Sequence, residues 1–377
     1  MSREAVFIGF LLLFLLVVHA QSAKTARAGR IWTVDDDGPA DFQTIQEAVN
    51  AASEGDAVFV HSGTYLEHVS ITKTISLFGE NSLDTIVDTP GTSISGISIE
   101  ADNVTVKNFT VRNTNLTPHW SYYKGGGIYL DSVHGCDVEN CVLVDNTCGI
   151  NLVNSSYNNI SNNLVAENGI GIPVWEYSSN NLIKGNWVLN NFEGLGGVAL
   201  GPSSKDNTVV ENYLWNNTLH IDGDDPAMGD VFYSASGVVA CNNFVENATV
   251  LIDYYYGNWQ PQPDIVWSMD GHCNFWIGYS GVDADGDGLG DTPHAIDENN
   301  TDNYPLIKPY NWLQGDVNYD GVVNILDLFA MARAFDSRPG DVRWNPRCDL
   351  NNDKTIDILD IFEVASRFKK EMSWPPQ

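Results

Sequence analysis

Basic residues are scarce in this chain. Its 377 residues include 19 lysines and arginines against 49 aspartates and glutamates, which gives a formal net charge of −30. The imbalance is strongest in residues 31–314, where 37 acidic side chains face 7 basic ones and Arg112 is the sole arginine. A surface of this sign repels nucleic acids and anionic membranes, so we expect neither as a partner.

Metal-binding cysteine pairs and long apolar runs are also missing. The six cysteines form no C-x-x-C pair, which argues against a zinc ribbon or a thioredoxin-type site. The N-terminal apolar run, residues 5–18, has 14 residues and is short for a membrane span. Small residues follow at Ala20 and Ala23, so residues 1–23 are predicted to be a signal peptide, with an uncleaved signal anchor as the alternative. The mature protein is then expected to be secreted, extracellular or attached to a cell surface.

One pattern of oxygen-bearing side chains occurs twice near the C-terminus. Both copies place such side chains at positions 1, 3, 5, 9 and 12 and a backbone carbonyl at position 7, as a Ca²⁺ loop requires. The expected ligands of loop one are Asp316, Asn318, Asp320, the Val322 carbonyl, Asn324 and Asp327. Those of loop two are Asp349, Asn351, Asp353, the Thr355 carbonyl, Asp357 and Asp360. Loop two has Lys354 where loop one has Gly321, at a sharp turn that favours glycine, so we predict that loop two binds Ca²⁺ more weakly.

An apolar helix is predicted after each loop, and neither loop has the entering helix of a standard EF-hand. Two such loop–helix units with aspartate at position 12 resemble a dockerin module, here over residues 311–370. The resemblance implies a calcium-folded attachment domain whose partner is a cohesin-type module and whose cargo is often carbohydrate-active. The pairs Ile325-Leu326 and Ile358-Leu359 are expected on the cohesin-facing surface. Four aromatic residues are expected in the small core: Phe329, Phe335, Phe362 and Phe368.

The central part of the chain repeats at about 22 residues. One series of asparagines is Asn140, Asn163, Asn186, Asn212, Asn243 and Asn274, and the other is Asn146, Asn168, Asn190, Asn216 and Asn247. Both series keep pace, so the longer late steps of 26 and 31 residues are interpreted as loop insertions. Short β-branched runs lie between the asparagines. The repeat therefore predicts a solenoid of short parallel strands whose stacked asparagine side chains hydrogen-bond along the axis.

Both ends of the repeat carry a resemblance to known β-helices. The strands between Ile31 and Gly79, with an amphipathic helix over 44–52, resemble the opening of pectin-lyase-like right-handed parallel β-helices. Residues 274–306 resemble the closing segment of NosD-like proteins, whose copper-delivery function does not transfer with the fold. The predicted fold class is therefore all-β: a right-handed parallel β-helix solenoid over 31–310, followed by the small α-helical dockerin-like domain.

A third acid-rich segment lies near the end of the predicted solenoid, ahead of the dockerin-like module. It packs four carboxylates into nine residues: Asp283, Asp285, Asp287 and Asp291. Carboxylates this close repel one another unless a cation lies among them. Position 12 is His294, so the segment is not an EF-hand loop. We expect Ca²⁺ here, clipping the loop that leaves the solenoid, and the alternative is a plain acidic loop.

Sugar-binding or catalytic residues are harder to predict. Two insertions stand out, residues 118–124 near Arg112 and residues 220–226 with Asp230 beyond them. Eight aromatic residues are candidates for stacking on sugar rings, although half or more would serve packing: Trp120, Tyr122, Tyr123, Trp175, Trp187, Trp215, Trp259 and Trp267.

No catalytic residue can be named from the sequence. The repeat places Asp145 over Glu167 one coil apart, at a spacing that suits a glycosidase, but chance stacking of abundant acids is the favoured explanation. Glu176 and the acids of 222–225 are further carboxyl candidates. A lyase base would have to come from Arg112, Lys107 or Lys124. Whether the protein is an enzyme stays open, and if it is one, a polysaccharide hydrolase or lyase is expected.

These features favour a secreted carbohydrate-binding or polysaccharide-processing β-helix that a calcium-dependent dockerin tethers to a cohesin-bearing partner. Its cofactor would be Ca²⁺, and its partners a cohesin module and a polysaccharide or glycan. One alternative is a non-catalytic cell-surface structural protein or adhesin, which eight N-glycosylation sequons and the lack of a catalytic set would suit. Another is a NosD-like copper-related accessory protein.

Overall fold

The computed structural model describes most of residues 29–370. The segments outside the described residues are 93–94, 115–124, 176, 192–196, 202–203, 218–229, 234–235, 246–249, 254–263, 270–271, 297–299, 310–312, 318–321, 339–340, 342, 344, 346–347 and 352. The predicted signal peptide, residues 1–23, also lies outside them. None of the described helices is long and apolar enough to cross a membrane.

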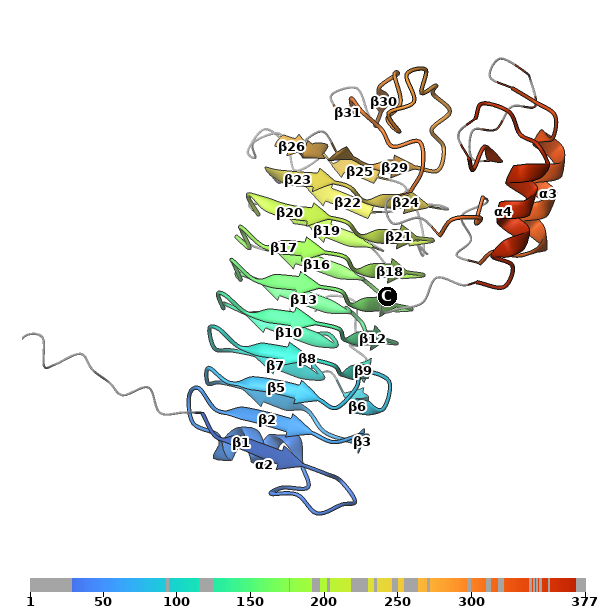
Figure 1. Cartoon of the computed structure of the whole chain (residues 1–377). Helices are drawn as coiled ribbons and strands as arrows, with labels where there is room; N and C mark the ends of the chain where they lie inside the picture. Colours follow the sequence, from blue (N-terminus) through green and yellow to red (C-terminus); the bar gives the residue numbers. More distant parts are fainter. Residues whose placement is uncertain are drawn as a thin grey trace, which may run out of the picture.

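The strands stack into three long parallel sheets that wind into a solenoid (Figure 1). The ten-stranded sheet contains β1 (Ile31–Val34), β2 (Ala57–Val60), β5 (Ser76–Gly79), β8 (Thr105–Lys107), β11 (Asp137–Glu139), β14 (Asn159–Ser161), β17 (Leu182–Lys184), β20 (Asn207–Val210), β23 (Ser236–Ala240) and β26 (Asp264–Val266). The nine-stranded sheet contains β3 (Gly63–Tyr65), β6 (Thr85–Thr92), β9 (Thr110–Thr114), β12 (Val142–Val144), β15 (Leu164–Ala166), β18 (Trp187–Leu189), β21 (Tyr213–Trp215), β24 (Asn243–Val245) and β29 (Phe275–Trp276). The eight-stranded sheet contains β4 (Val69–Ile71), β7 (Ile97–Ile99), β10 (Ile128–Asp131), β13 (Ile150–Val153), β16 (Ile172–Trp175), β19 (Val198–Leu200), β22 (Asp230–Tyr233) and β25 (Val250–Asp253).

The path of the chain through these sheets makes each coil. The chain passes from β11 through β12 and β13 into β14, which pairs in parallel with β11 one coil further on. In the three-residue strands β8, β11 and β14 of the ten-stranded sheet the middle residue points inward, and Val106, Val138 and Ile160 stack there with no exposed surface. The fold class predicted from the repeat is thus confirmed as a parallel β-helix.

A short helix covers the N-terminal end of the solenoid (Figure 1). Helix α2 (Ile45–Ala51) buries Ile45, Ala48 and Val49 against the first coils, as the amphipathic pattern predicts. The carboxylate of Glu67 accepts the N–H groups of Ile45 at 2.8 Å and Gln46 at 2.9 Å. Burial raises the pKa of Glu67, and these two hydrogen bonds oppose the rise. The first turn of the helix is therefore fixed by an acid from the solenoid itself.

Buried asparagines form three hydrogen-bonded ladders along the solenoid. In each ladder the backbone N–H of one asparagine donates to the side-chain oxygen of the next, at 2.9–3.0 Å in the step from Asn163 through Asn186 to Asn212. The first ladder is Asn163, Asn186, Asn212, Asn242 and Asn274, and it ends on the carboxylate of Asp302. The second is Asn146, Asn168, Asn191 and Asn217. A third ladder, not anticipated from the sequence, is Asn158, Asn181 and Asn207.

Two of the predicted ladder positions, Asn140 and Asn243, are wrong by one residue. Asn190 and Asn216 do stack as predicted, because the Asn216 side-chain amide donates to the Asn190 side-chain oxygen at 2.8 Å, but the buried ladder runs through their neighbours Asn191 and Asn217. Asn140, Asn190 and Asn216 have left-handed backbones, with φ near +50°. Each of them occupies the corner just before a ladder position, where a side chain points outward. Asn243 lies instead in β24, one residue after the ladder residue Asn242. Asn247 lies outside the described residues. Asparagine is common at both kinds of position because it tolerates the left-handed region and can also bridge coils.

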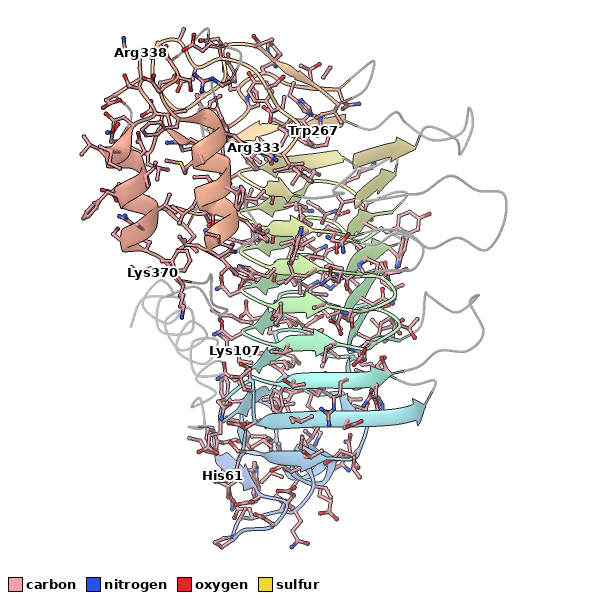
Figure 2. All side chains as sticks on the ribbon, turned by 90° about the vertical axis from the view of Figure 1, so that its right-hand side faces the viewer. His61, Lys107, Trp267, Arg333, Arg338 and Lys370 are labelled. Carbon is pink, nitrogen blue, oxygen red and sulfur yellow. The ribbon has the colours of Figure 1, made fainter. Side chains whose placement is uncertain are left out.

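Two helices form the C-terminal domain and lie beside the last coils of the solenoid (Figures 1 and 2). Helices α3 (Ile325–Ala334) and α4 (Ile358–Ser366) each begin with a capping box. The core of this domain is Val317, Val323, Met331, Ala334, Cys348, Leu350, Ile356 and Val364. The expected aromatic core is wrong, because Phe329 and Phe362 are 62% and 70% exposed and Phe335 and Phe368 are 38% and 41% exposed. Small aliphatic side chains suffice to fill the space between two such short helices.

Candidate calcium sites and solenoid surfaces

Loop two, residues 349–360, folds around the carboxylate of its first residue. Asp349 accepts the N–H groups of Asp353 at 3.1 Å and Lys354 at 2.9 Å. The Asp353 N–H also donates to Asn351, and the Thr355 N–H donates to Asp353 at 2.8 Å. Burial raises the pKa of Asp349, the two N–H groups oppose that rise, and Asp360 and Asp353 reinforce it. A donor set of carboxylate and amide oxygens fits a hard divalent cation such as Ca²⁺.

The acid at position 12 closes both dockerin loops in the same way. Asp360 is fully buried and accepts the N–H groups of Leu350 at 2.8 Å and Asp357 at 2.9 Å. Asp327 accepts the equivalent N–H groups of loop one at 2.8 and 2.7 Å. In both loops the last expected ligand is therefore also the acid of the helix capping box. Of the other expected ligands of loop one, Asp316, Val322 and Asn324 are described, and the Asn324 side-chain amide donates to the Val322 carbonyl at 3.2 Å. Asn318, Asp320 and Gly321 lie outside the described residues.

Position 6 of loop two requires a backbone that suits glycine. Lys354 has φ +65°, in the left-handed region, as the comparison with Gly321 predicts. A residue with a Cβ in this region costs about 1 kcal/mol relative to glycine. Loop two therefore carries backbone strain at this position.

The acid-rich loop, residues 283–294, is built like loop two. Asp283 accepts the N–H groups of Asp287 at 3.2 Å and Gly288 at 3.0 Å. Asp285 accepts from Asp287, and Asp287 accepts from Leu289 at 2.8 Å. Asp283, Asp285 and Asp287 each offer an oxygen within 4.8 Å of the others. Among the described residues, Asp35, Asp36 and Asp37 form the other group of this kind.

The second half of the acid-rich loop differs from loop two. Asp291, at position 9, accepts the Ala284 N–H at 2.6 Å, a bond that the acid at position 12 makes in the dockerin loops. His294 instead stacks on Trp276 with ring centroids 4.7 Å apart. Burial lowers the pKa of His294, and Asp302 opposes this. His294 therefore serves packing at position 12, where loop two has the expected ligand Asp360.

Backbone hydrogen bonds fasten the acid-rich loop to the end of the solenoid. The Gly290 N–H donates to Pro305 at 2.8 Å, and the Ile307 N–H donates to Gly288 at 3.1 Å. Leu306 in turn donates to the carbonyl of Asn274 at 2.8 Å and continues the nine-stranded sheet next to Phe275. Residues 305–307, called the closing strap below, thus join the acid-rich loop to the last coil.

Two of the three candidate lyase bases are held in ion pairs. Arg112 Nε lies 2.8 Å from Asp88 Oδ2, and Asp88 also accepts from the Asn113 side chain at 2.8 Å. Lys107, labelled in Figure 2, pairs with Glu139 on the next coil. Lys124 lies outside the described residues. Both described bases are thus tied to neighbouring coils, which indicates a structural role.

The carboxyl candidates are only partly described. Strand register pairs Val144 with Ala166, so the exposed residues Asp145 and Glu167 do follow one another on successive coils. Both have left-handed φ values, 56° and 57°, and occupy the corners before ladder asparagines. Their position is therefore explained by the coil repeat. Residues 118–124, Glu176 and the 220–226 insertion lie outside the described residues, and Asp230 begins β22.

The described candidate aromatic residues divide into packed and surface groups. Trp175 and Trp267 are 7% and 5% exposed and belong to packed clusters. Trp187 and Trp215 are half-buried on the outer face of the nine-stranded sheet, and Trp187 contacts Tyr213 with ring centroids 5.4 Å apart. Trp120, Tyr122, Tyr123 and Trp259 lie outside the described residues. Among the described residues, the candidate aromatic side chains that reach the surface therefore gather on the outer face of the nine-stranded sheet.

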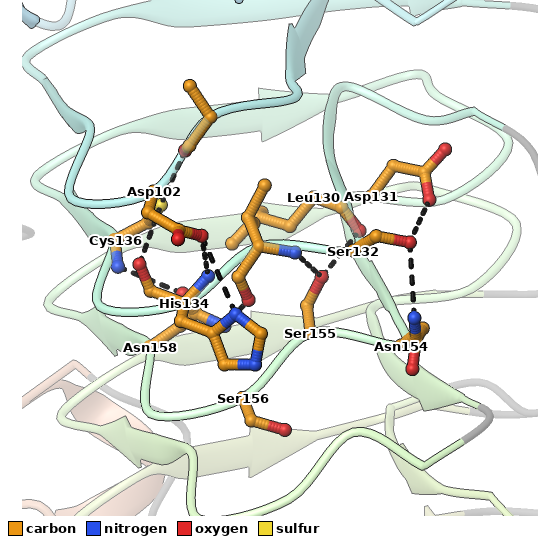
Figure 3. Close-up of polar contacts among 12 residues, drawn as sticks. Asp102, Leu130, Asp131, Ser132, His134, Cys136, Asn154, Ser155, Ser156 and Asn158 are labelled. Atoms are coloured by element: carbon orange, nitrogen blue, oxygen red, sulfur yellow. Dashed lines mark hydrogen bonds and ion pairs between the residues drawn. The ribbon is translucent and has the colours of Figure 1, made fainter. Parts of the chain in front are cut away.

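Sequence reasoning did not single out one polar row on the solenoid surface (Figure 3). Asp102 accepts the His134 N–H at 2.7 Å and lies 3.5 Å from its ring nitrogen Nδ1. His134 is bridged to Ser156 on the following coil, and the Ser156 hydroxyl accepts the Ser179 N–H at 2.9 Å. These bonds satisfy backbone groups at the corners, so the row stabilises the coil. The sequence signal for this row is the recurrence of polar residues at the coil period, as at His134, Ser156 and Ser179.

Each dockerin helix exposes three large apolar side chains in its first two turns. These side chains are more than half exposed and fall at equivalent positions after the two loops: Ile325, Leu326 and Phe329, and Ile358, Leu359 and Phe362. Monomeric proteins rarely expose large clustered apolar side chains unless they bind a partner. We call these six residues the apolar face.

Comparison with known proteins identifies both parts of the chain. The family described as periplasmic copper-binding protein (NosD) matches residues 49–281. The chain belongs to this family. A dockerin type I domain matches residues 314–369, which contain both calcium-type loops and both C-terminal helices. The two resemblances predicted from the sequence are therefore confirmed, and the dockerin class is one that typically binds calcium.

Individual relatives are distant. The chain is 26% identical over 236 residues to a cell surface glycoprotein from Methanothermus fervidus, a match over 55% of this chain and 38% of that protein. Among solved structures, pectin methylesterase PemA from Erwinia chrysanthemi is similar with a TM-score of 0.39 and 14% identity, over 69% of this chain and 92% of that one. The catalytic domain of a GH87 alpha-1,3-glucanase is similar with a TM-score of 0.42 and 16% identity, over 70% of this chain and 49% of that one.

Proposed function

We propose that this protein is a secreted carbohydrate-binding or polysaccharide-processing β-helix, tethered by its dockerin to a cohesin-bearing partner in a calcium-dependent way. The observation that carries the proposal is the dockerin domain with its exposed apolar face. The solenoid would occupy residues 31–310 and the dockerin residues 311–370. The signal peptide over residues 1–23 would direct the chain out of the cell.

The calcium part of the proposal rests on the donor sets. Loop two would bind Ca²⁺ through Asp349, Asn351, Asp353, the Thr355 carbonyl, Asp357 and Asp360. Loop one would use its equivalents: Asp316, Asn318, Asp320, the Val322 carbonyl, Asn324 and Asp327. The acid-rich loop would bind a further Ca²⁺ through Asp283, Asp285, Asp287 and Asp291. The bound cation would neutralise part of the negative charge of the carboxylates. Backbone N–H groups already hold the turns of loop two and of the acid-rich loop through hydrogen bonds to their aspartates.

The apolar face supports a partner-binding role for the dockerin. The pairs Ile325-Leu326 and Ile358-Leu359 would face the cohesin, and the exposed Phe329 and Phe362 extend that surface. Exposed aromatic and aliphatic side chains on rigid helices are well suited to be interface anchors. Replacing both Ile-Leu pairs by Ser-Ser should abolish capture by a cohesin without changing the helical circular dichroism. Unchanged cohesin affinity would contradict the proposal.

The glycan part of the proposal rests on surface aromatic residues and on the company that dockerins keep. It draws on the half-buried aromatic residues Trp187 and Trp215 and on the dockerin itself, since dockerins often accompany carbohydrate-active domains. The alternative, a non-catalytic cell-surface spacer or adhesin, is supported by the similarity to a cell surface glycoprotein and by the ion pairs that occupy Arg112 and Lys107.

A third role, in copper delivery, follows only from the family description. Copper favours imidazole and sulfur ligands. The described groups of three metal-ligating side chains contain only aspartates, which favour Ca²⁺ instead. His272 and Cys273 form β28 (His272–Cys273), which pairs with β27 (Ser268–Met269), and nothing more is described for their side chains.

One screen separates these roles. The mature chain would be incubated with neutral and acidic polysaccharides, with and without Ca²⁺, and products and retention would be measured. Reducing-end or unsaturated products would show an enzyme, and retention without products would show a binder. If no glycan tested gives products or retains the protein, the result would support the spacer role. Metal analysis after mild purification would test copper.

A further inference from the structure

Lys308 connects the end of the solenoid to loop two of the dockerin. It is the only lysine or arginine between Lys205 and Arg333. It directly follows the closing strap, and its ammonium donates to the backbone oxygen of Asp349 at 3.3 Å. Its side chain is half-buried. Asp349 is the first residue of loop two, and its carboxylate is the first expected calcium ligand.

The charges around this ammonium come from two separate loops. The carboxylates of Asp349 and Asp360 belong to loop two, and that of Asp283 belongs to the acid-rich loop. Burial lowers the pKa of Lys308, and all three carboxylates act against that shift. Each of the two loops holds four carboxylates, so the ammonium lies in a strongly negative field.

We propose that Lys308 is a built-in cation that fixes the dockerin on the end of the solenoid and competes with Ca²⁺ in loop two. The inference rests on the proposed calcium binding by that loop. An ammonium and a calcium ion that share one ligand residue repel each other, most strongly where water is partly excluded. The coupling is reciprocal, so the lysine contact weakens calcium binding and bound calcium loosens the contact. Lys308 is a positioning residue in this scheme, since it sets the direction in which the apolar face points.

The test compares Lys308→Met, which keeps the apolar stem, with Lys308→Arg, which keeps the charge, in the full mature chain. Lys205→Met, at an exposed solenoid position, controls for the loss of one charge. In a calorimetric calcium titration, Lys308→Met should bind Ca²⁺ about threefold to tenfold more tightly at one dockerin site. Lys308→Arg and Lys205→Met should titrate like the parent chain.

The direction of the change is decisive. If Lys308 were merely structural, its loss would weaken calcium binding by destabilising the domain. Equal or weaker binding by Lys308→Met would therefore overturn the inference. A second measurement uses spin labels on the solenoid and on α4 at one calcium concentration that leaves loop two half-occupied in the parent chain, where Lys308→Met should broaden the distance distribution. An unchanged distribution would also overturn it. A parent chain that binds no calcium in the dockerin would instead refute the proposed function itself.

Discussion

Loop two of the dockerin and the acid-rich loop of the solenoid are built on the same turn but end differently. Four hydrogen bonds from backbone N–H groups to side-chain oxygens occur at identical offsets in the two loops. Position 6 is Lys354 in one and Gly288 in the other, and position 12 is Asp360 or His294. The first half of such a loop is therefore dictated by its own aspartates. The second half depends on the element that follows the loop. After loop two this element is helix α4, whose first turn needs an acidic cap. After the acid-rich loop it is the closing strap, which pairs with the nine-stranded sheet.

Chelation should separate the two loops most strongly. The dockerin core consists of few side chains, and its loop carboxylates repel one another without a cation, so excess chelator should unfold α3 and α4. The acid-rich loop is held by the closing strap and the last coil, so the solenoid should stay folded. Circular dichroism should then lose its helical part and keep its β part. A helical signal that survives chelation would contradict this prediction.

Position 12 should matter in one loop only. In Asp360→Ala, the buried N–H groups of Leu350 and Asp357 lose their acceptor, which should destabilise the dockerin by about 2–4 kcal/mol and remove one calcium site. His294→Ala leaves the aspartates of the acid-rich loop intact and should leave the calcium stoichiometry unchanged. Calorimetry on both variants, with the parent chain as reference, measures this. A calcium site lost in His294→Ala would show that the two loops end alike after all.

Much of this architecture could be predicted from the sequence because it depends on repetition. The coil period follows from asparagines and β-branched runs, and the dockerin follows from two copies of one ligand pattern. The ladder register could not be read reliably, because corner and ladder residues are adjacent and both favour asparagine, as at Asn190 and Asn191. The third ladder begins under Cys136, whose N–H donates to Asn158, so no asparagine marks its start.

The exposure of the dockerin aromatic residues could not be predicted from their chemistry. Phe329 and Phe362 fall at helical spacing from apolar neighbours, which is also the pattern of a core. Whether such a face is covered depends on the partner and on the distance between the two helices. The sequence of a single helix specifies neither. Likewise, the ion pair of Arg112 with Asp88 joins residues from different coils, 24 positions apart.

Exchanging the residues at position 6 should bring the calcium affinities of loop two and the acid-rich loop closer together. Lys354→Gly should relieve the left-handed strain at φ +65° and tighten calcium binding by loop two, by about 1 kcal/mol or roughly fivefold in the dissociation constant. Gly288→Lys, at φ +90°, should weaken calcium binding by the acid-rich loop. Lys354→Gln serves as the control, because it removes the charge and keeps the Cβ. If Lys354→Gln matches Lys354→Gly, charge rather than backbone strain explains the weaker loop.

The smallest expected effect is a pH dependence confined to the acid-rich loop. His294 stacks on Trp276, and burial lowers its pKa below the ordinary value of 6.5, so the folded state prefers the neutral ring. The contribution of this packing is complete above pH 6.5 and is lost as the pH falls from there through the lowered pKa of the folded state. Because the ring is partly exposed, the unfolding midpoint of the solenoid should fall by only about 1–2 °C. His294→Phe keeps an aromatic ring on Trp276 but has no titrating group, so it should remove this decrease of the unfolding midpoint at low pH. If the decrease persists in His294→Phe, the carboxylates of the loop cause it.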